Sequence, residues 1–444
     1  MSSRRAFLTG TAAAAGGSLV ACAPPRGGGE DAGAGARTVR NHPRDGLERE
    51  NVTIADIKVT LLSHEIPEKE QWYLDWVPER YRAWKSDSIL VEVFTNQGIA
   101  GIGGATQYGG PPEVKKFIEE TIKPLVVGQN IFDAPFLTCG VSSRGPLVGW
   151  GGVDSALWDV IGKVKGKPVY DLLATDHAPQ PRVPVYASAG EMYDGDVWPD
   201  NLIEEALGFK EQGFTAWKFR PGTHWSVSGM TVPRYVKGLE KIRAAVGPDF
   251  QLIQECNRQW TPDQVLEMCP VFEELGFLWI EDPTPNWVEG AMDSYVRIRE
   301  ALPTVMVSYG GDSIENRFQY KEWIDRGTLD IVQPDCGVGG TVEAWHISRM
   351  AHLFDKVVAP HNWHGGLLTM ANAHLAAGIP NLLMLEAGRT FNPLREAVFK
   401  EPLVVVDGHM QLPDKPGFGV EVIDDLAERF PYIPGRYDQP RPKA

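Results

Sequence analysis

Seven polar residues recur at a regular interval in the second half of the chain, and each follows a short apolar run. These residues are Lys218, Glu255, Glu281, Asp312, Asp335, His361 and Glu386. Their mean spacing is 28 residues. A (β/α)₈ barrel of about 250 residues repeats its unit every ~31 residues, and the side chains at its C-terminal strand ends meet at one mouth. The spacing therefore predicts that the seven side chains converge on one site.

Glu255, Glu281 and Asp312 are carboxylates at the ends of three successive predicted strands. A single acidic residue at a strand end is usually solvated. Three that face one another form an all-oxygen site, which suits Mg²⁺, with Mn²⁺ as the second choice. Glu315 is an alternative third ligand in place of Asp312.

Lys218 and Arg220 stand two residues apart on one predicted strand, so their side chains point to the same side. Two cations inside a barrel require anions, which the metal carboxylates and a substrate carboxylate supply.

His361 and Asp335 end neighbouring predicted strands, and a carboxylate behind an imidazole fixes its tautomer and raises its basicity. This pair is the predicted general base. The remaining histidines of this region and of the early chain are interpreted as structural: His64, His346, His352, His374 and, near the same loop, His364.

The elements that position these residues are eight apolar runs that alternate with amphipathic helical patterns. This alternation predicts parallel βαβ units closed into a barrel. The runs are 183–187, 216–219, 251–254, 277–280, 305–307, 331–332, 356–359 and 382–385, with helices such as 201–212, 234–246 and 262–275 between them. The chain before them predicts an α+β region, with strands at 52–60 and 88–94 and helices at 113–126 and 152–165.

An aromatic-rich stretch at 64–85 has no helical or strand period and is interpreted as a long loop, which in a compact domain is usually functional. We expect this loop and the stretch 141–150 to select the substrate. Arg80, Arg82 and Arg144 are candidate contacts, although a surface charge is the more common role for such residues.

Three motifs resemble those of the enolase superfamily, in its mandelate racemase-like branch. They are Val-Asp-Ser-Ala-Leu-Trp-Asp-Val-Ile-Gly-Lys at 153–163 with Gly-Lys-Pro at 166–168, Pro-His-Asn at 360–362 with Gly365 and Gly366, and Pro-Gly-Phe-Gly-Val-Glu at 416–421. The resemblance covers residues from about 52 to the mid-420s. It implies a modified (β/α)₇β barrel at 181–390, an N-terminal α+β capping domain at 51–180, and a C-terminal segment, 391–444, that returns to the capping domain.

The same resemblance implies one Mg²⁺ and a first step that removes the α-proton of a carboxylate. Carried over residue by residue, it makes Glu255, Glu281 and Asp312 the metal ligands and Asp335 with His361 the catalytic dyad. Glu386 occupies the position of a protonated acid that hydrogen-bonds the enediolate. The chain departs from the family in having Glu255 where Asp is usual and Asp312 where Glu is usual.

A third departure decides among the activities of the family. Where the family often has a second lysine that acts as a base, this chain has Arg220, and a guanidinium is always protonated. A two-base racemase is therefore disfavoured. A one-base dehydratase is favoured, in which His361 takes the α-proton of an acid sugar and the β-hydroxyl leaves to give a 2-keto-3-deoxy acid. The alternatives are a racemase or epimerase of a 2-hydroxy acid and a catalytically inactive, exported sugar-acid-binding homologue.

The N-terminus predicts export. Arg4 and Arg5 precede an apolar run at 6–20, which resembles a twin-arginine signal peptide over residues 1–22, and Cys22 ends a lipobox-like sequence. Residues 23–50 read as a disordered tether. The expected location is the periplasm or cell surface, with a lipid anchor at Cys22.

The net charge of −15 argues against nucleic acid as a partner. The expected partner is a small carboxylate, and a homo-oligomer is expected.

Overall fold

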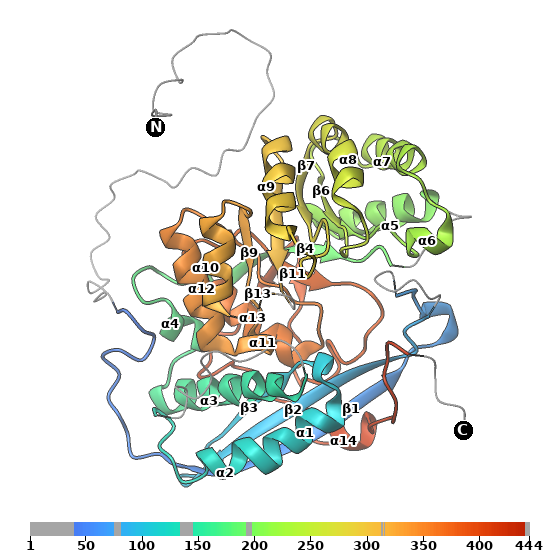
Figure 1. The fold of residues 1–444 in the computed structure, drawn as a ribbon. Coiled ribbons are helices and arrows are strands. Elements are labelled where there is room, and N and C mark those ends of the chain that lie inside the picture. The colour runs from blue at the N-terminus through green and yellow to red at the C-terminus, as the bar shows by residue number, and fades with distance from the viewer. Residues whose placement is uncertain are drawn as a thin grey trace, which may run out of the picture. The chain divides into compact units, whose positions relative to one another are not determined.

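A closed barrel of parallel strands forms the larger part of the described chain (Figure 1). The structure is a computed structural model that describes residues 40–74, 81–133, 145–191, 198–311, 314 and 316–439. Residues 38–444 belong to one compact unit. The barrel strands are β4 (Arg182–Ser188), β5 (Ala216–Phe219), β6 (Gln251–Glu255), β7 (Phe277–Glu281), β8 (Met306–Gly310), β9 (Ile331–Gln333), β10 (Val357–Val358) and β11 (Leu385–Gly388).

The pairing of these strands closes the ring. Consecutive strands from β4 to β10 pair in parallel, and β11 pairs in parallel with β4. A bridge between Val358 and Leu382 ties β10 to the segment before β11. Inside the ring, Tyr186, Ile253 and Trp279 pack together as a buried apolar cluster.

Each connection between barrel strands carries at least one helix, and β11 is the last strand, which gives the (β/α)₇β arrangement. The helices are α5 (Asp200–Glu211), α6 (Trp225–Ser228), α7 (Val232–Val246), α8 (Pro262–Glu274), α9 (Ala291–Ala301), α10 (Arg317–Asp325), α11 (Cys336–Gly339), α12 (Thr341–Leu353) and α13 (Gly366–Ala377). The expected fold class is therefore confirmed.

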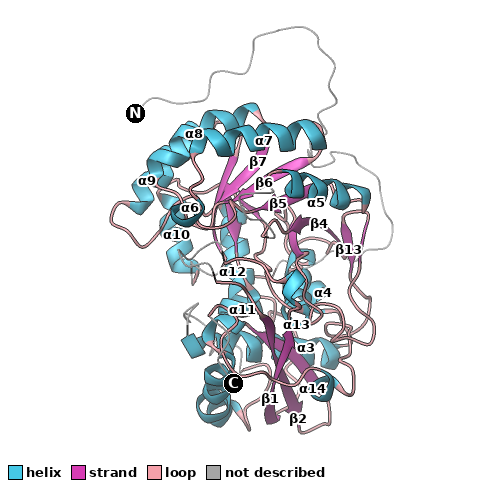
Figure 2. Ribbon diagram, turned by 90° about the vertical axis from the view of Figure 1, so that its right-hand side faces the viewer, coloured by secondary structure: helices cyan, strands magenta, loops and turns pink. Residues whose placement is uncertain are grey.

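The capping region is an antiparallel sheet of β1 (Ile54–Glu65), β2 (Lys85–Thr95) and β3 (Ala100–Ala105), in the order β1-β2-β3. Its helices are α1 (Pro111–Phe117), a π-helical turn at Ile118–Ile122, α2 (Lys123–Val126), α3 (Gly149–Lys165) and α4 (Val169–Leu173). Short 3₁₀ turns lie at Glu68–Glu70, Gln107–Gly109 and Gly145–Val148. Figure 2 shows this sheet at one end of the unit and the barrel strands at the other.

Two expectations for the capping region need correction. The stretch 64–85 begins and ends in strands, because β1 runs to Glu65 and β2 starts at Lys85. The helix expected at 113–126 is interrupted by the π-helical turn just before Pro124, whose missing N–H cannot continue the α-helical hydrogen bonds.

The C-terminal segment contacts both parts of the unit. β13 (His409–Gln411) pairs antiparallel with β4 and with β12 (Val405–Val406). Farther on, α14 (Leu426–Arg429) is followed by a bridge between Pro431 and Leu62 of the capping sheet. Both barrel and cap are thus completed by residues from the far end of the chain. The expected domain boundaries themselves stay predictions.

Three cysteines, Cys256, Cys269 and Cys336, are buried and unpaired. Cys22 and Cys139 lie outside the described residues. No helix of the described part is long and apolar enough to cross a membrane.

Candidate active site

A cavity of about 750 Å³ lies at the C-terminal ends of the barrel strands. Five of the residues selected from the sequence line it: Lys218, Arg220, Glu255, Glu281 and His361. Asp335 and Glu386 stand directly behind them, in contact with His361 and Lys218 respectively. Asp312 and its alternative Glu315 lie outside the described residues. The barrel therefore brings together the seven candidates that the structure describes, and their catalytic roles stay predictions.

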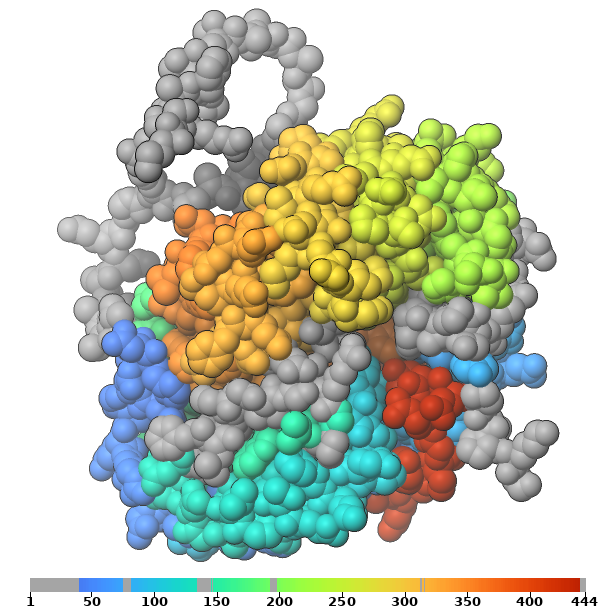
Figure 3. All heavy atoms as spheres, in the orientation of Figure 1, coloured from blue at the N-terminus to red at the C-terminus, as the bar shows by residue number. Residues whose placement is uncertain are grey.

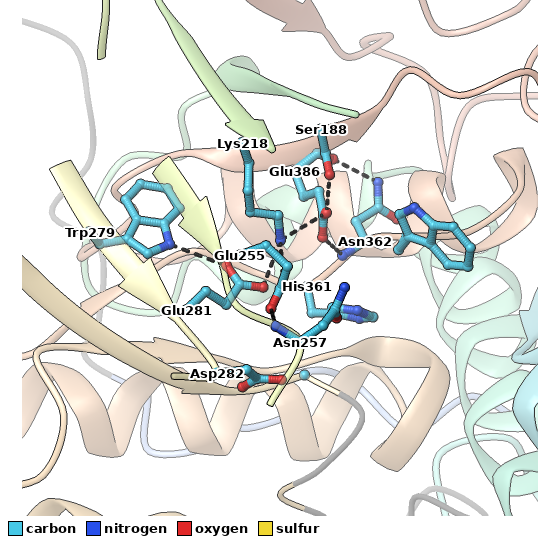
Figure 4. A network of polar contacts seen from close by, with 12 residues as sticks. Ser188, Lys218, Glu255, Asn257, Trp279, Glu281, Asp282, His361, Asn362 and Glu386 are labelled. Carbon is cyan, nitrogen blue, oxygen red and sulfur yellow. Dashed lines mark hydrogen bonds and ion pairs between the residues drawn. The ribbon is translucent and has the colours of Figure 1, made fainter. Parts of the chain in front are cut away.

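Lys218 is the centre of a buried charge network (Figure 4). Its Nζ lies 2.6 Å from Glu281 Oε1, 3.0 Å from Glu386 Oε1 and 3.6 Å from Glu255 Oε2. Burial alone would lower the pKa of the Lys218 ammonium, but these carboxylates outweigh burial and hold the pKa well above its usual range. Lys218 is therefore a fixed positive charge at neutral pH.

Glu255 and Glu281 end neighbouring strands in register with one another. Burial, together with the negative charge of Glu281, raises the pKa of Glu255 well above its usual range. For Glu281, burial acts in the same direction, but the Lys218 ammonium outweighs it and holds the pKa of Glu281 below its usual range. The two carboxylates repel each other, so a proton on Glu255 or a bound cation would relieve the repulsion.

The carboxylates are oriented by neighbouring donors. The Trp279 indole donates to Glu281 Oε2 at 3.2 Å, and the Asn257 backbone N–H donates to Glu255 Oε1 at 2.8 Å. Hard, pre-oriented carboxylate oxygens fit Mg²⁺, and ligands held by such donors bind metal better than free ones. Glu255 and Glu281 would hold the ion, with the third ligand expected from the 312–315 stretch.

Asp335 accepts hydrogen bonds from two imidazoles. His361 Nδ1 lies 2.8 Å and His364 Nε2 lies 2.7 Å from Asp335 Oδ2, while the Gly337 N–H donates to Oδ1 at 2.8 Å. Burial would raise the pKa of Asp335, but the two histidines outweigh burial and hold the pKa well below its usual range. The predicted dyad is thus a triad of side chains, because His364, which was expected near the same loop as His361, also contacts Asp335.

The ligand atoms of Asp335, His361 and His364 are also close enough to hold a metal ion, since they lie within 4.8 Å of one another. The hydrogen bonds to Asp335 Oδ2 already satisfy one nitrogen of each ring. The oxygen-rich pair Glu255 and Glu281 is therefore the better site for Mg²⁺.

Glu386 differs from the expectation of a protonated acid. Its Oε1 accepts from Ser188 Oγ at 2.6 Å, and its Oε2 accepts from the Asn362 N–H at 2.8 Å. Burial would raise the pKa of Glu386, but Lys218, His361 and Arg220 outweigh burial and hold the pKa below its usual range. Glu386 is therefore ionised in this arrangement and serves as a counter-ion to the cations.

Arg220 is held by groups at the end of the first barrel strand, β4, and just after it. Its Nη1 lies 2.8 Å from Glu191 Oε1, 3.0 Å from Ser188 Oγ and 2.8 Å from the Ala189 carbonyl oxygen. Glu191 lines the cavity and is buried. Sequence reasoning missed Glu191, although it follows a strand end as the selected residues do. The seven selected residues lie at the ends of the other seven predicted strands, and none of them lies at the end of the first, 183–187.

Of the three candidate arginines, the structure describes only Arg82. Arg80 and Arg144 lie outside the described residues. Arg82 donates to the Tyr73 hydroxyl at 2.7 Å and is not among the cavity-lining residues described. Trp72 packs edge-on against Trp363, with ring centroids 4.9 Å apart, and Trp363 lines the cavity.

Two family models match the chain. The model described as "Enolase C-terminal domain-like" matches residues 201–426, and the model described as "Mandelate racemase / muconate lactonizing enzyme, N-terminal domain" matches residues 83–174. The first covers the barrel from α5 onward, and the second covers most of the cap.

Curated relatives and solved structures agree with these matches. The chain is 29% identical to arabinonate dehydratase of Saccharolobus solfataricus over 351 residues, which is 77% of this chain and 90% of the relative. It is 28% identical to D-xylonate dehydratase of Haloferax volcanii, over 77% of this chain and 84% of the relative.

Among solved structures, a member of the enolase superfamily from Polaromonas sp. JS666 matches with a TM-score of 0.75 and 26% identity, over 86% of this chain and 99% of that chain. The 3,6-anhydro-D-galactonate cycloisomerase of Zobellia galactanivorans matches with a TM-score of 0.71 and 26% identity, over 85% of this chain and 99% of that chain. The chain belongs to the enolase superfamily, in its mandelate racemase and muconate lactonizing enzyme group.

Proposed function

We propose that this enzyme is a Mg²⁺-dependent acid-sugar dehydratase that converts an aldonate-type acid into a 2-keto-3-deoxy acid. The observation that carries the proposal is that, of the three basic side chains that were selected from the sequence and line the cavity, only one is suited to take up a proton. His361, on Asp335, is a titratable imidazole, whereas Lys218 and Arg220 are held as permanent cations. One base is sufficient for an elimination, and a two-base racemase needs a second one.

The hydrogen bond to Asp335 fixes the tautomer of His361. If Nδ1–H donates to Asp335 Oδ2, Nε2 carries the lone pair that takes the α-proton. Lys218 and Arg220 neutralise the substrate carboxylate and the charge that develops on it. The His361 imidazolium then returns its proton to the departing β-hydroxyl, and the enol product tautomerises. Mg²⁺, when bound, would act as a Lewis acid toward the substrate carboxylate.

The relatives support the substrate class. The names arabinonate dehydratase and D-xylonate dehydratase describe enzymes that act on sugar acids, and the chain covers more than four-fifths of each. Another relative, 29% identical, is named D-galactarolactone cycloisomerase, from Agrobacterium fabrum, and so is named for a different reaction. The racemase and the inactive binding homologue remain the alternatives that the experiment below separates.

The test is a screen of stereochemically diverse aldonates for keto-acid formation. We expect at least one substrate to be converted with Mg²⁺, no conversion with a strong chelator, and recovery when Mg²⁺ is restored. Full activity with the chelator would contradict the metal assignment. Tight binding of an acid sugar without conversion would favour the inactive homologue, and interconversion of epimers would favour the epimerase.

Location and assembly are part of the proposal. Export by the twin-arginine route is supported by Arg4 and Arg5 before the apolar run, and a lipid anchor is supported by the resemblance of Leu-Val-Ala-Cys at 19–22 to a lipobox. The proposed protein is periplasmic or at the cell surface, and it acts as a homo-oligomer on a small carboxylate.

A further inference from the structure

The C-terminal segment enters the cavity from the capping side. Arg436, Tyr437 and Asp438 line the same cavity as Lys218 and His361. The match to the barrel family model ends at residue 426, so these three residues lie beyond it. In the space-filling view, red atoms of the C-terminal segment lie at the surface near blue atoms of the early capping strands (Figure 3).

Buried polar groups at the start of β2, and Trp84 just before it, anchor this segment. The Trp84 indole N–H lies 3.0 Å from the Arg436 carbonyl oxygen and 3.1 Å from that of Gln439. The Lys85 ammonium donates to the Ile433 carbonyl oxygen at 2.6 Å and pairs with Asp87 at 2.8 Å, and both charged side chains are buried. The backbone on both sides of Arg436 is therefore held by the cap.

A second anchor is apolar. Tyr437 is buried and packs in one cluster with Trp72, Leu74 and Ile66, against which Trp363 also packs. Its neighbours in the chain, Arg436 and Asp438, remain partly exposed, with 49% and 22% of their side chains accessible. The tyrosine therefore fixes the segment, while the two charged residues stay accessible for a ligand.

The chemistry of the exposed pair suits hydroxyl groups. Arg436 Nε and Nη2 lie 2.9 and 2.8 Å from the two carboxylate oxygens of Asp438. A guanidinium has five N–H donors, and a carboxylate has about four acceptor positions, so both groups keep capacity for further hydrogen bonds. The pair carries no net charge. It therefore suits neutral hydroxyls, which donate and accept, better than a second carboxylate.

We propose that Arg436 and Asp438 form a distal subsite that binds the hydroxyl-bearing end of the acid sugar, while Lys218 and Arg220 bind its carboxylate. This inference rests on the proposed function and names the part of the substrate that the C-terminal segment binds. The proposal predicts that a longer aldonate contacts both groups of residues, whereas a three-carbon acid contacts only Lys218 and Arg220. The subsite therefore selects substrates by chain length and hydroxyl pattern.

The experiment compares Arg436→Gln and Asp438→Asn with the unmodified enzyme. Asp438→Asn keeps the size of its side chain, whereas Arg436→Gln shortens the side chain but keeps it polar, and both positions are partly exposed. We expect the KM for a six-carbon aldonate to rise about 10- to 100-fold, since bonds to charged groups are lost. The rate of α-proton exchange at saturation should change less than about threefold. The inhibition constant of glycerate, which is too short to reach the subsite, should stay within about twofold.

Arg429→Gln is the matched control, because Arg429 lies on α14 in the same segment but is not among the described residues that line the cavity. An unchanged KM, or an equal loss for glycerate and the hexonate, overturns the subsite. If the unmodified enzyme converts no aldonate, the proposed function fails instead. Calorimetric titration with the hexonate and glycerate then gives the same comparison of variants without turnover.

Discussion

At the scale of single residues, a histidine's role in this chain depends on its partner. His361 and His364 share the buried carboxylate of Asp335, whereas His374 bonds only to backbone groups. The sequence was enough to select His361, because it ends a strand next to the one that Asp335 ends. It was not enough to select His364, since its approach to Asp335 depends on the course of the loop after β10.

Arg220 gives a prediction at this scale. If it acts only as a fixed charge, Arg220→Lys should keep most of the activity, whereas Arg220→Met should raise the KM of the acid about 10-fold or more. Arg220→Met should still exchange the α-proton at saturating substrate. Steady-state kinetics of both variants checks this. Equal inactivation of both variants at saturation would show that the guanidinium takes part in the chemical step.

At the scale of elements, the strands were predicted best where both faces are buried and the apolar run is continuous. β5 occupies the predicted residues. The run at 382–385 was placed too early, because β11 begins at Leu385. Leu383 and Met384 are apolar for a different reason, since they pack against the cluster inside the barrel.

β3 was not predicted at all, and its glycines explain why. A strand of sequence Ala-Gly-Ile-Gly-Gly-Ala lacks the β-branched pattern of a strand, and glycine there marks the close approach of another backbone. A Cβ atom on Gly103 would lie 2.3 Å from the carbonyl oxygen of Gly152 in α3. Helix and sheet are therefore in direct backbone contact, which a sequence period does not reveal.

This contact predicts that Gly103→Ala lowers the free energy of unfolding by about 1–3 kcal/mol, because the new methyl group must push α3 away from the sheet. Urea unfolding measures the change. Gly208→Ala in α5 is the control, since no atom lies within 4 Å of its added Cβ, and it should leave stability unchanged or slightly raised. Equal stability of the two variants would contradict the account of this interface.

His374 predicts an acid sensitivity of the cap–barrel contact. Its Nδ1 accepts from the Tyr170 N–H of α4 at 3.2 Å, and its Nε2 donates to the Phe418 carbonyl oxygen at 3.1 Å. Burial lowers the pKa of His374 from 6.5 to about 3. At a pH between about 3 and 6.5, His374 binds a proton in the unfolded chain but not in the folded chain. Stability is therefore fully present above about pH 6.5 and falls as the pH drops toward 3.

At pH 4.5 the loss from this group is about 3 kcal/mol relative to pH 7.5, from ~1.4 kcal/mol per pH unit. His374→Gln removes the titration, so its loss of stability between the two pH values should be smaller by about that amount. Urea titrations at both pH values measure the difference. The exposed His352→Gln serves as control, and an acid loss in His374→Gln equal to that of the unmodified protein would contradict the assignment.

At the scale of the whole molecule, the barrel and its mouth were predictable because they follow from periodicity and spacing. The far wall of the cavity was not, because it depends on how the C-terminal segment returns over the cap. Arg436 and Asp438 stand some 50 residues beyond Glu386, and no local pattern marks them as cavity residues. Closure of a site by segments distant in sequence is visible only in the assembled fold.

The location of the protein is also a property of the whole molecule. A lipid anchor at Cys22 predicts that Cys22→Ser releases the protein from the membrane fraction. The expected reason is loss of the thiol that carries the lipid, and the specific activity should not change because Cys22 precedes the compact unit. Fractionation of cells with an activity assay measures both. If the unmodified exported protein is already soluble, the lipid anchor is wrong.

The central claim is that His361 removes the α-proton of an acid sugar. The most direct measurement follows deuterium incorporation at the α-carbon of a slowly converted aldonate in deuterated water, with Mg²⁺ present. The unmodified enzyme and Arg220→Met should exchange this proton. His361→Asn should lose exchange and keto-acid formation by roughly 10²–10⁴-fold or more while still binding Mg²⁺ and substrate. Exchange by His361→Asn at the unmodified rate, with none by Arg220→Met, would contradict the claim and return the racemase to first place.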